Sequence, residues 1–385
     1  MLFDPRAHER LIEDRWDSDR VRAAIREIAE DAEGSFDDGW PTHPKDVYEK
    51  GDEEQRFRAV YDGGAGVIQA LDSLHRRGLV DRRRDYVSYL ERSCEPAFPD
   101  DGERSLWMGE TGIRLVLHRL SPSTENADRL AELIAANAND ERREVMWGSP
   151  GTMLAAAAMH ELTGEERWVE LWRESATWLR DEWDPQTALW TQHLHGLVEQ
   201  FIGPAHGFAG CVLALSNDAD DEVHRRAAEA TVRYAVEEDG LANWPPTASM
   251  KSLRANRDGS IRVQWCHGSP GVVASLARLA PDDDEHGRLL RAGGELTWRA
   301  GPLSKGSNLC HGTAGNGYAF LALFERTQDE LWLERARAFA MHSVAQVARA
   351  RGEFGHGRYT LWTGDPGTAL YLADCLAGGG AVPLP

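Results

Sequence analysis

Apolar runs with a helical period dominate the chain, and seven of them begin directly after the same turn. The turn has the form Gly-x-x-Gly, and the run that follows is apolar on almost every side. Similarity at a recurring spacing is the signature of a repeat architecture, so we expect seven copies of one structural unit. The glycine pairs that mark them are Gly63/Gly66, Gly109/Gly112, Gly148/Gly151, Gly207/Gly210, Gly268/Gly271, Gly312/Gly315 and Gly364/Gly367.

A second kind of helical pattern lies between the turns, for example at 127–134, 168–179 and 332–340. These segments are amphipathic and rich in Arg and Glu, whereas a helix that is apolar all round is a buried one. Alternating strand patterns are scarce, which favours an all-α class. We therefore predict an α/α toroid of seven helix pairs, with apolar inner helices and amphipathic outer ones. An open solenoid would instead need polar caps at its ends.

No linker divides the 385 residues, so we expect one domain over 1–385. Residues 1–62 precede the first turn and predict a helix at about 17–32 and a polar loop at about 34–50, both packing on the toroid. Two insertions, at about 184–206 and 240–262, lack periodicity. Loops at the catalytic end of a barrel commonly line the substrate-binding site, and we expect that role for both insertions.

Charge and composition exclude several classes of function. The net charge of −20 argues against nucleic-acid binding, which depends on Lys and Arg. No apolar run is long enough to span a membrane, and the first residues do not resemble a secretion signal. Five scattered cysteines, an odd number, do not predict a disulfide framework. We therefore expect a cytoplasmic protein with reduced thiols.

Two cysteines occupy the same place in neighbouring repeats. Cys266 and Cys310 each stand two residues before the first glycine, and His311 follows Cys310 directly. Two thiolates and an imidazole are a zinc-ligand set, and three protein ligands leave the fourth position for water or substrate. Because a metal-coordinated thiol is deprotonated, the expected use is activation of a substrate thiol. The alternative interpretation is a coincidence of buried thiols.

Two further histidines and a carboxylate precede turns of the same kind. His206, directly before Gly207, is a candidate to give or take a proton during an addition reaction, or it is a capping or core histidine. His267 follows Cys266 and either lines the site as acid or base or points away. Glu144, four residues before Gly148, either orients a base or is a surface carboxylate.

Three cationic residues stand near the candidate ligands in the sequence. Arg262 is four residues before Cys266, Lys305 is five before Cys310, and Arg358 precedes the seventh turn. Each either holds a carboxylate or stabilises an enolate, or is a solvated loop charge. Lysine is otherwise rare, since the chain has only Lys45, Lys50, Lys251 and Lys305 among its 43 basic residues.

The segments 265–268 (Trp-Cys-His-Gly) and 309–316 (Leu-Cys-His-Gly-Thr-Ala-Gly-Asn), together with the seven turns, resemble the LanC-like superfamily. That superfamily comprises bacterial lanthipeptide cyclases and eukaryotic LanC-like proteins, and the resemblance extends from about residue 60 to about residue 378. It implies an α/α toroid with one zinc ion and addition of a zinc-bound thiolate to dehydroalanine or dehydrobutyrine. It also implies Cys266, Cys310 and His311 as zinc ligands, His206 as the catalytic histidine and Arg262 as a site residue.

Details of the resemblance favour the eukaryotic branch, whose members use glutathione. His267 stands where the cyclases usually have tyrosine, Lys305 matches a lysine of that branch, and Arg358 falls near its glutathione-contacting arginine. Glu144 stands where the cyclases usually have aspartate. We therefore expect a zinc enzyme that adds glutathione, or a similar small thiol, to dehydroamino acid residues of a peptide or protein. The alternatives are a lanthipeptide cyclase and a non-catalytic scaffold that binds a peptide or another ligand.

Overall fold

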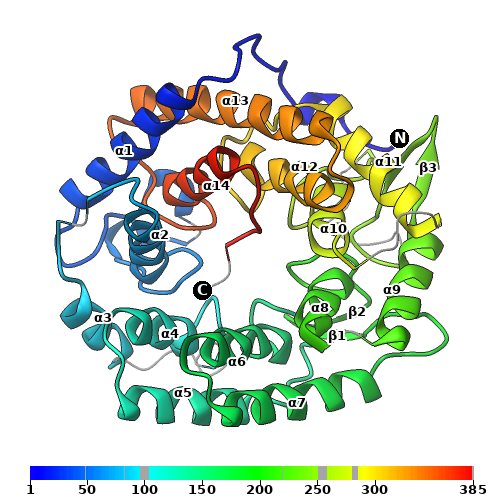
Figure 1. The fold of residues 1–385 in the computed structure, drawn as a ribbon, viewed down its shortest axis with the longest axis horizontal. Helices are drawn as coiled ribbons and strands as arrows, with labels where there is room; N and C mark the ends of the chain where they lie inside the picture. The colour runs from blue at the N-terminus through cyan, green and yellow to red at the C-terminus, as the bar shows by residue number, and fades with distance from the viewer. Residues whose placement is uncertain are drawn as a thin grey trace.

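The computed structural model describes residues 1–47, 49–81, 83–95, 104–218, 220–249, 258–279 and 285–383. Fourteen α-helices lie within these ranges, and they form two concentric rings (Figure 1). The inner ring contains α2 (Gly64–Arg76), α4 (Glu110–Leu120), α6 (Ser149–Thr163), α8 (Phe208–Leu215), α10 (Ser269–Leu276), α12 (Thr313–Thr327) and α14 (Asp365–Ala377). The outer ring contains α1 (Ser18–Gly34), α3 (Val87–Cys94), α5 (Thr124–Ala136), α7 (Glu166–Asp181), α9 (Asp221–Tyr234), α11 (Glu285–Ala300) and α13 (Glu330–Phe354).

Both rings are closed by the two ends of the chain. Each inner helix contacts the next, and α14 contacts both α12 and α2. The outer partner of α14 is the N-terminal helix α1, which packs along it (Figure 1). The predicted all-α toroid of seven helix pairs is therefore confirmed, and its seventh pair joins the first helix of the chain to the last.

The repeated turn exists because the backbone doubles back on itself at each inner helix start. In every repeat, a Cβ on the second glycine would lie 1.7–2.3 Å from the carbonyl oxygen six residues earlier, far inside contact distance. Close approach is thus the reason for glycine at this position. Of the fourteen glycines in the seven turns, only Gly268 has a positive φ, at +109°.

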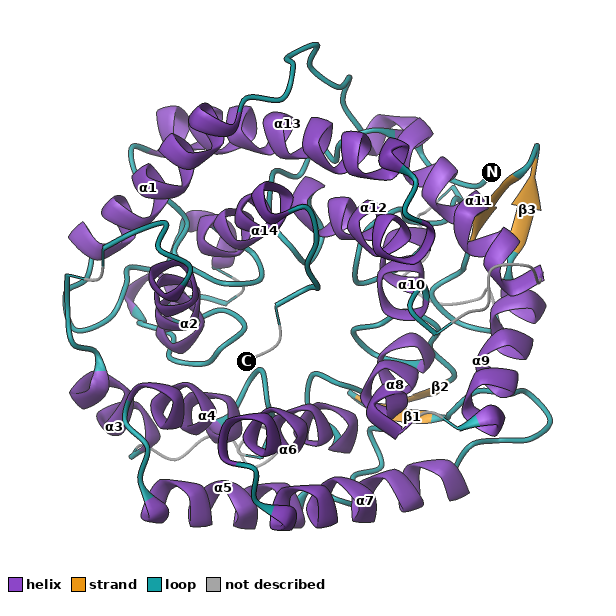
Figure 2. Cartoon of the chain, viewed as in Figure 1, coloured by secondary structure: helices purple, strands orange, loops and turns teal. Residues whose placement is uncertain are grey.

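The two insertions are more regular than the sequence pattern indicated. The first contains an antiparallel hairpin of β1 (Gln192–Leu194) and β2 (Leu197–Glu199), with Gln192 opposite Glu199 (Figure 2). The second follows β3 (Val236–Glu238) and contains β4 (Leu241–Asn243), and these two strands also pair antiparallel, while residues 250–257 lie outside the described ranges. Strands of three residues are too short for their alternation to be recognised in a sequence.

Short 3-10 turns complete the described structure: η1 (Pro5–Ala7), η2 (Pro44–Asp46), η3 (Asp52–Glu54) and η4 (Ser216–Asp218). Two of them, η2 and η3, lie in or next to the region predicted as a polar loop, and α1 agrees with the helix predicted at 17–32. Among the described residues, no helix has the length and apolar character required to cross a membrane.

Candidate active site

A belt of backbone hydrogen bonds runs along the rim where the inner helices begin. The N–H of Cys266 donates to the carbonyl of Cys310 at 3.1 Å, and that of Cys310 donates to Trp362 at 2.9 Å. The belt continues from Trp362 to Tyr61 at 3.1 Å and from Tyr61 to Trp107 at 2.9 Å. All five residues stand two positions before the first glycine of their turn. The belt therefore crosses the junction of the chain ends and sets the two cysteines side by side.

The thiols of Cys266 and Cys310 are buried and hydrogen-bonded to each other. This contact lowers the pKa of Cys266, helped by the Gln264 amide and by the charges of Lys305 and Arg262. The same contact, together with burial, raises the pKa of Cys310 well above its usual range. The contact therefore moves the two pKa values apart, and Cys310 holds its proton more tightly than Cys266 does.

His311 follows Cys310 directly in the chain and presents a neutral imidazole on the same rim. Burial, followed by the charges of Lys305 and Arg358, lowers the pKa of His311 to about 4. Its backbone N–H donates to the side chain of Asn308 at 3.0 Å, which holds the start of the turn. A neutral ring and an ionisable thiol are the protonation states that a metal ligand needs.

The donor set fits a zinc ion in its chemistry, since two thiols and a neutral imidazole come from adjacent positions of the rim. As the side chains stand, however, no three His, Cys, Asp or Glu residues in the described ranges form a group that could hold a metal ion. The sulfurs of Cys266 and Cys310 are already in contact. Coordination by all three residues therefore requires a side-chain rearrangement.

Glu144 is a buried carboxylate that positions His206. Its side chain is fully buried, which excludes the alternative of a surface carboxylate. It accepts backbone hydrogen bonds from Met146 at 2.9 Å, Trp147 at 2.6 Å and Gly148 at 3.1 Å. Its remaining partner is Nδ1 of His206 at 3.1 Å. The carboxylate is therefore locked by the turn that starts α6 and fixes the orientation of the imidazole.

His206 lies among other aromatic rings of the same rim. Its ring stacks on Trp147, with centroids 5.7 Å apart and planes 12° apart. The ring of His267 is 6.1 Å away on another side, and its side chain is buried. His267 therefore faces the site rather than solvent. The structure brings His206, His267 and Glu144 together.

The three cationic candidate residues differ in their burial and in the groups with which they interact. Arg262 is half-buried and its charge reaches the Cys266 thiol, while Lys305 is exposed and its charge acts on both thiols. Arg358 is 11% exposed and is paired with Asp46, with Nε 2.7 Å from Oδ2 and a second contact through the other guanidinium nitrogen. The guanidinium of Arg358 therefore attaches the N-terminal segment to the rim.

Three residues near this site were not identified from the sequence. The hydroxyl of Tyr61 hydrogen-bonds to the Cys310 thiol, and the amide Nε2 of Gln264 lies 2.9 Å from the Cys266 sulfur. Burial, with repulsion from Asp46, raises the pKa of Asp62 to about 6. Tyr61 has the register of the cysteines and Asp62 that of His206, so the repeat alignment contained a signal for both. Nothing in the sequence pattern indicates Gln264.

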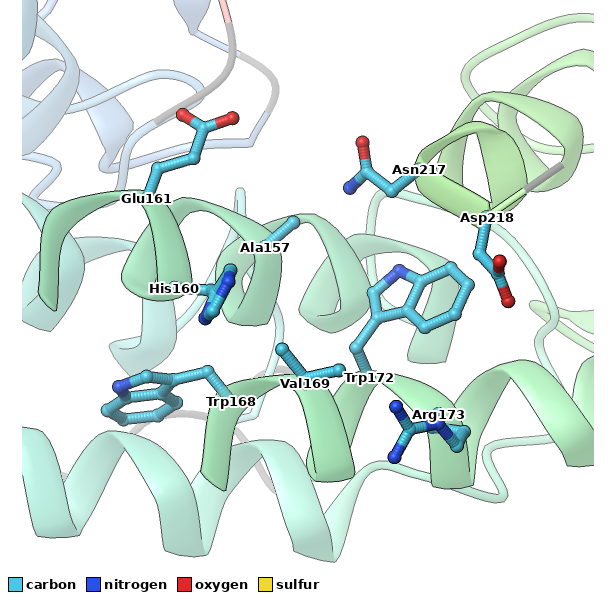
Figure 3. Close-up of a pocket in the computed structure, with 9 residues that line it drawn as sticks. All are labelled: Ala157, His160, Glu161, Trp168, Val169, Trp172, Arg173, Asn217 and Asp218. Carbon is cyan, nitrogen blue, oxygen red and sulfur yellow. The ribbon is translucent and has the colours of Figure 1, made fainter. Parts of the chain in front are cut away.

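A larger pocket lies away from this chemistry, between α6, α7 and η4 (Figure 3). Its lining residues on α6, such as His160, are more than two helical turns beyond the helix start that carries Glu144 and Trp147. Figure 3 shows Trp168, Val169 and Trp172 along one side, and neither Trp168 nor Trp172 is more than 6% exposed. The lining includes no thiol, so this pocket is not the candidate active site.

The chain is similar in sequence to a protein family and to several known proteins. The family model of the "Lanthionine synthetase C-like protein" matches residues 58–383. The chain is 34% identical over 184 residues to "Glutathione S-transferase LANCL1" of Danio rerio, covering 46% of this chain and 44% of that protein. It is 32% identical over 185 residues to "LanC-like protein GCL1" of Arabidopsis thaliana, covering 46% of this chain and 41% of that protein. The aligned part thus spans less than half the length of each relative.

A solved structure, "Nisin cyclase", has a similar fold, with a TM-score of 0.56 and 16% sequence identity over 84% of this chain and 94% of the cyclase. At this level of identity the likeness concerns the fold alone. The family model, by contrast, covers most of the 385 residues, including both cysteine turns and the histidine of the fourth. The protein belongs to the lanthionine synthetase C-like family.

Proposed function

We propose that this protein adds a small thiol, such as glutathione, to dehydroalanine or dehydrobutyrine residues and forms a thioether, with zinc held by Cys266, Cys310 and His311. The observation that carries the proposal is the contact between the two thiols on neighbouring helix starts. Two buried sulfurs at one point of a rim, with a neutral imidazole on the residue that follows Cys310, offer a soft ligand set. When bound there, zinc would supply ionisation of a substrate thiol at neutral pH.

The reaction joins the thiol sulfur to the β-carbon of the alkene and moves one proton to the α-carbon, so it needs no oxidant and releases no leaving group. His206 is the group that handles this proton. An ionised Glu144 can only accept hydrogen bonds, so Nδ1 of His206 carries the hydrogen and Nε2 has a free lone pair. Nε2 takes the proton of the incoming thiol and returns it to the α-carbon.

The remaining residues of the site stabilise the negative charge that develops in the reaction and exclude water from it. Arg262 and Lys305 place positive charge beside the thiols, where negative charge develops as the sulfur attacks. His267 and Trp147 pack around His206 and keep water from its ring. Low local polarity strengthens each of these interactions.

Two observations support glutathione as the thiol. A relative that shares 34% identity over 184 residues has the name glutathione S-transferase, although the aligned part covers only 44% of it. Lys305 also lies close enough to act on both thiols, so a carboxylate of the thiol substrate has a cation to bind.

The test is incubation of the zinc-loaded protein with glutathione and a peptide that contains dehydroalanine, followed by mass spectrometry. We expect a mass increase of one glutathione on the peptide, lost in His206→Ala. Absence of the adduct while zinc remains bound would contradict the proposal. Preferential ring closure in a peptide that also contains cysteine would instead assign the protein as a cyclase. Peptide binding without any product, unaffected by His206→Ala, would assign it as a scaffold.

A further inference from the structure

Arg143, the residue directly before Glu144, has a backbone conformation that L-amino acids rarely adopt. Its φ angle is +46°, in the left-handed region, where the Cβ of any residue but glycine crowds the backbone. Strain of this kind persists only where the surrounding structure enforces it, and it is concentrated at functional sites. The contacts of Arg143 therefore bear on the pair that Glu144 forms with His206.

The carbonyl oxygen of Arg143 joins the third turn to the fourth. It accepts the thiol hydrogen of Cys211 at 3.0 Å and an N–H of the Gln192 amide at 3.1 Å, which uses both of its lone pairs. Both donors are fully buried. Cys211 directly follows the second glycine of the turn that begins after His206. The residue beside Glu144 is therefore hydrogen-bonded to the repeat that carries His206.

The guanidinium of Arg143 holds the same loop from a buried position, with 11% of the side chain exposed. Nη1 donates to the carbonyl oxygens of Glu141 at 3.1 Å and Thr191 at 2.9 Å, and Nη2 lies 2.6 Å from the carboxylate of Glu182. The group also lies over the ring of Trp178, 5.0 Å from its centre. A planar guanidinium can make all these contacts at once. One side chain thus connects the loop before α6 to α7 and to the residue before β1.

We propose that Arg143 is a positioning residue for proton transfer at His206. Its guanidinium holds the left-handed backbone conformation, and that conformation directs the Glu144 carboxylate to Nδ1 of His206, 3.1 Å away. The inference rests on the proposed function and adds to it a residue that acts through Glu144. Because Glu144 is the next residue, a change in the backbone dihedral angles at Arg143 displaces the carboxylate. A displacement of about 1 Å can reduce the rate of a reaction about 100-fold.

Two substitutions separate the backbone conformation from the side chain that holds it. Arg143→Ala removes the guanidinium and leaves a Cβ in the left-handed conformation. We expect its kcat with glutathione and a dehydroalanine peptide to fall about 10–100-fold, with the KM for glutathione unchanged. Arg143→Gly loses the same contacts but adopts a positive φ without strain, so it should recover most of the lost kcat. Both are assayed as zinc-loaded full-length protein below their melting temperatures.

Arg335 provides a matched control for the loss of a buried arginine. Its side chain is also 11% exposed, it pairs with the half-exposed Glu295 at 2.7 Å, and it lies over Trp298, 5.2 Å from the ring centre. These partners belong to α11, on another part of the ring (Figure 1). Arg335→Ala should therefore lower the melting temperature about as much as Arg143→Ala does and leave kcat unchanged. An equal loss of kcat in the two variants would overturn the inference.

The tautomer of His206 gives a measurement that does not depend on turnover. Nuclear magnetic resonance of protein labelled with 15N-histidine reports which ring nitrogen carries the hydrogen, and His206→Ala assigns the signal. We expect the Nδ1–H form in the wild type and in Arg143→Gly, and a mixture of both tautomers in Arg143→Ala.

Three further outcomes decide the inference. An unchanged tautomer and kcat in Arg143→Ala would overturn it. Equal losses of kcat in Arg143→Ala and Arg143→Gly would also overturn it, because the backbone conformation would then have no effect of its own. A protein whose His206 tautomer depends on Arg143 in the expected way, but which makes no thioether, would sustain the positioning role and refute the proposed function.

Discussion

The orientation of His206 depends on one buried carboxylate, and Glu144→Gln tests that dependence. A glutamine keeps the shape, but its amide can no longer accept as many backbone hydrogen bonds, and it can donate to Nδ1 of His206 and so favour the wrong tautomer. We expect thioether formation to fall by about 100-fold or more, the typical contribution of a positioned acid or base. The measurement is the initial rate with glutathione and a dehydroalanine peptide.

A matched histidine is available as the control. His195 also contacts Trp147, with ring centres 5.0 Å apart, but it is exposed. His195→Ala should therefore retain most of the activity. If Glu144→Gln retained the wild-type rate and melting temperature, the carboxylate would have no part in proton transfer.

The hydroxyl of Tyr61 should affect metal affinity. Groups that hydrogen-bond to a metal ligand typically change metal affinity by about 10–100-fold when removed, and Tyr61→Phe removes the bond to the Cys310 sulfur. We expect a weaker zinc affinity of that size, measured by competition with a chelator. Tyr86→Phe is the control, because it removes a buried hydroxyl that bonds to Glu33 instead. Equal zinc affinity in both variants would refute a role for Tyr61.

At the scale of single residues, much of the site could be predicted from the position of each residue relative to the turn of its repeat. The alignment of turns placed Cys266, Cys310, His311 and His206 at equivalent points, and the structure brings them to one rim. Contacts between side chains that are far apart in the sequence could not be predicted from this alignment. The sequence did not indicate that the carboxylate of Asp46 would form an ion pair with the guanidinium of Arg358, because the two residues are 312 positions apart. The role of Gln264 depends on a side-chain direction that no pattern encodes.

At the scale of the helix start, Gly315→Ala tests why the turn is repeated. An added Cβ would lie 1.7 Å from the carbonyl oxygen of Leu309, so the backbone must move at the turn that carries Cys310 and His311. We expect a loss of more than about 3 kcal/mol in the free energy of unfolding. Chemical denaturation measures it.

Gly352 provides the comparison, since it lies in the exposed end of α13 and an added Cβ would contact nothing within 4 Å. Gly352→Ala should stabilise the protein by up to about 1 kcal/mol, the difference in helix propensity. Equal effects of the two substitutions would show that close approach is not the reason for the glycine at 315.

Helices were predictable and hairpins were not, for a physical reason. A helix of 8–25 residues shows its period several times, whereas β1 to β4 have three residues each and show less than two full alternations. The burial of the inner helices was visible as well, since α8 and α10 are buried at nearly every position. The reason for glycine in the turns could not be read from the sequence, because glycine permits two explanations, backbone freedom and close approach, which a sequence cannot separate.

At the scale of the molecule, the first helix of the chain closes the ring. In an open solenoid each repeat depends on its neighbours alone, so a terminal helix can detach without affecting distant repeats. Here α1 packs on α14, and α14 contacts α12 on one side and α2 on the other. The N-terminal segment is also held by Glu9, which lies 2.7 Å from both His342 and Arg349 of α13. Loss of α1 would therefore disturb both neighbours of the seventh repeat.

Ile25→Ala tests whether the closed ring unfolds as one unit. Ile25 is fully buried on α1, so its truncation should cost about 2–5 kcal/mol, and Arg22→Ala on the exposed face should change stability by less than about 0.5 kcal/mol. We expect the entire transition of Ile25→Ala to shift, with tryptophan fluorescence and helical circular dichroism still coincident. Hydrogen exchange should then accelerate in α2 and α12 as well as in α1. Faster exchange confined to α1, with the main transition unchanged, would show instead that the N-terminal helix is an appendage and that the remaining helices hold the ring without it.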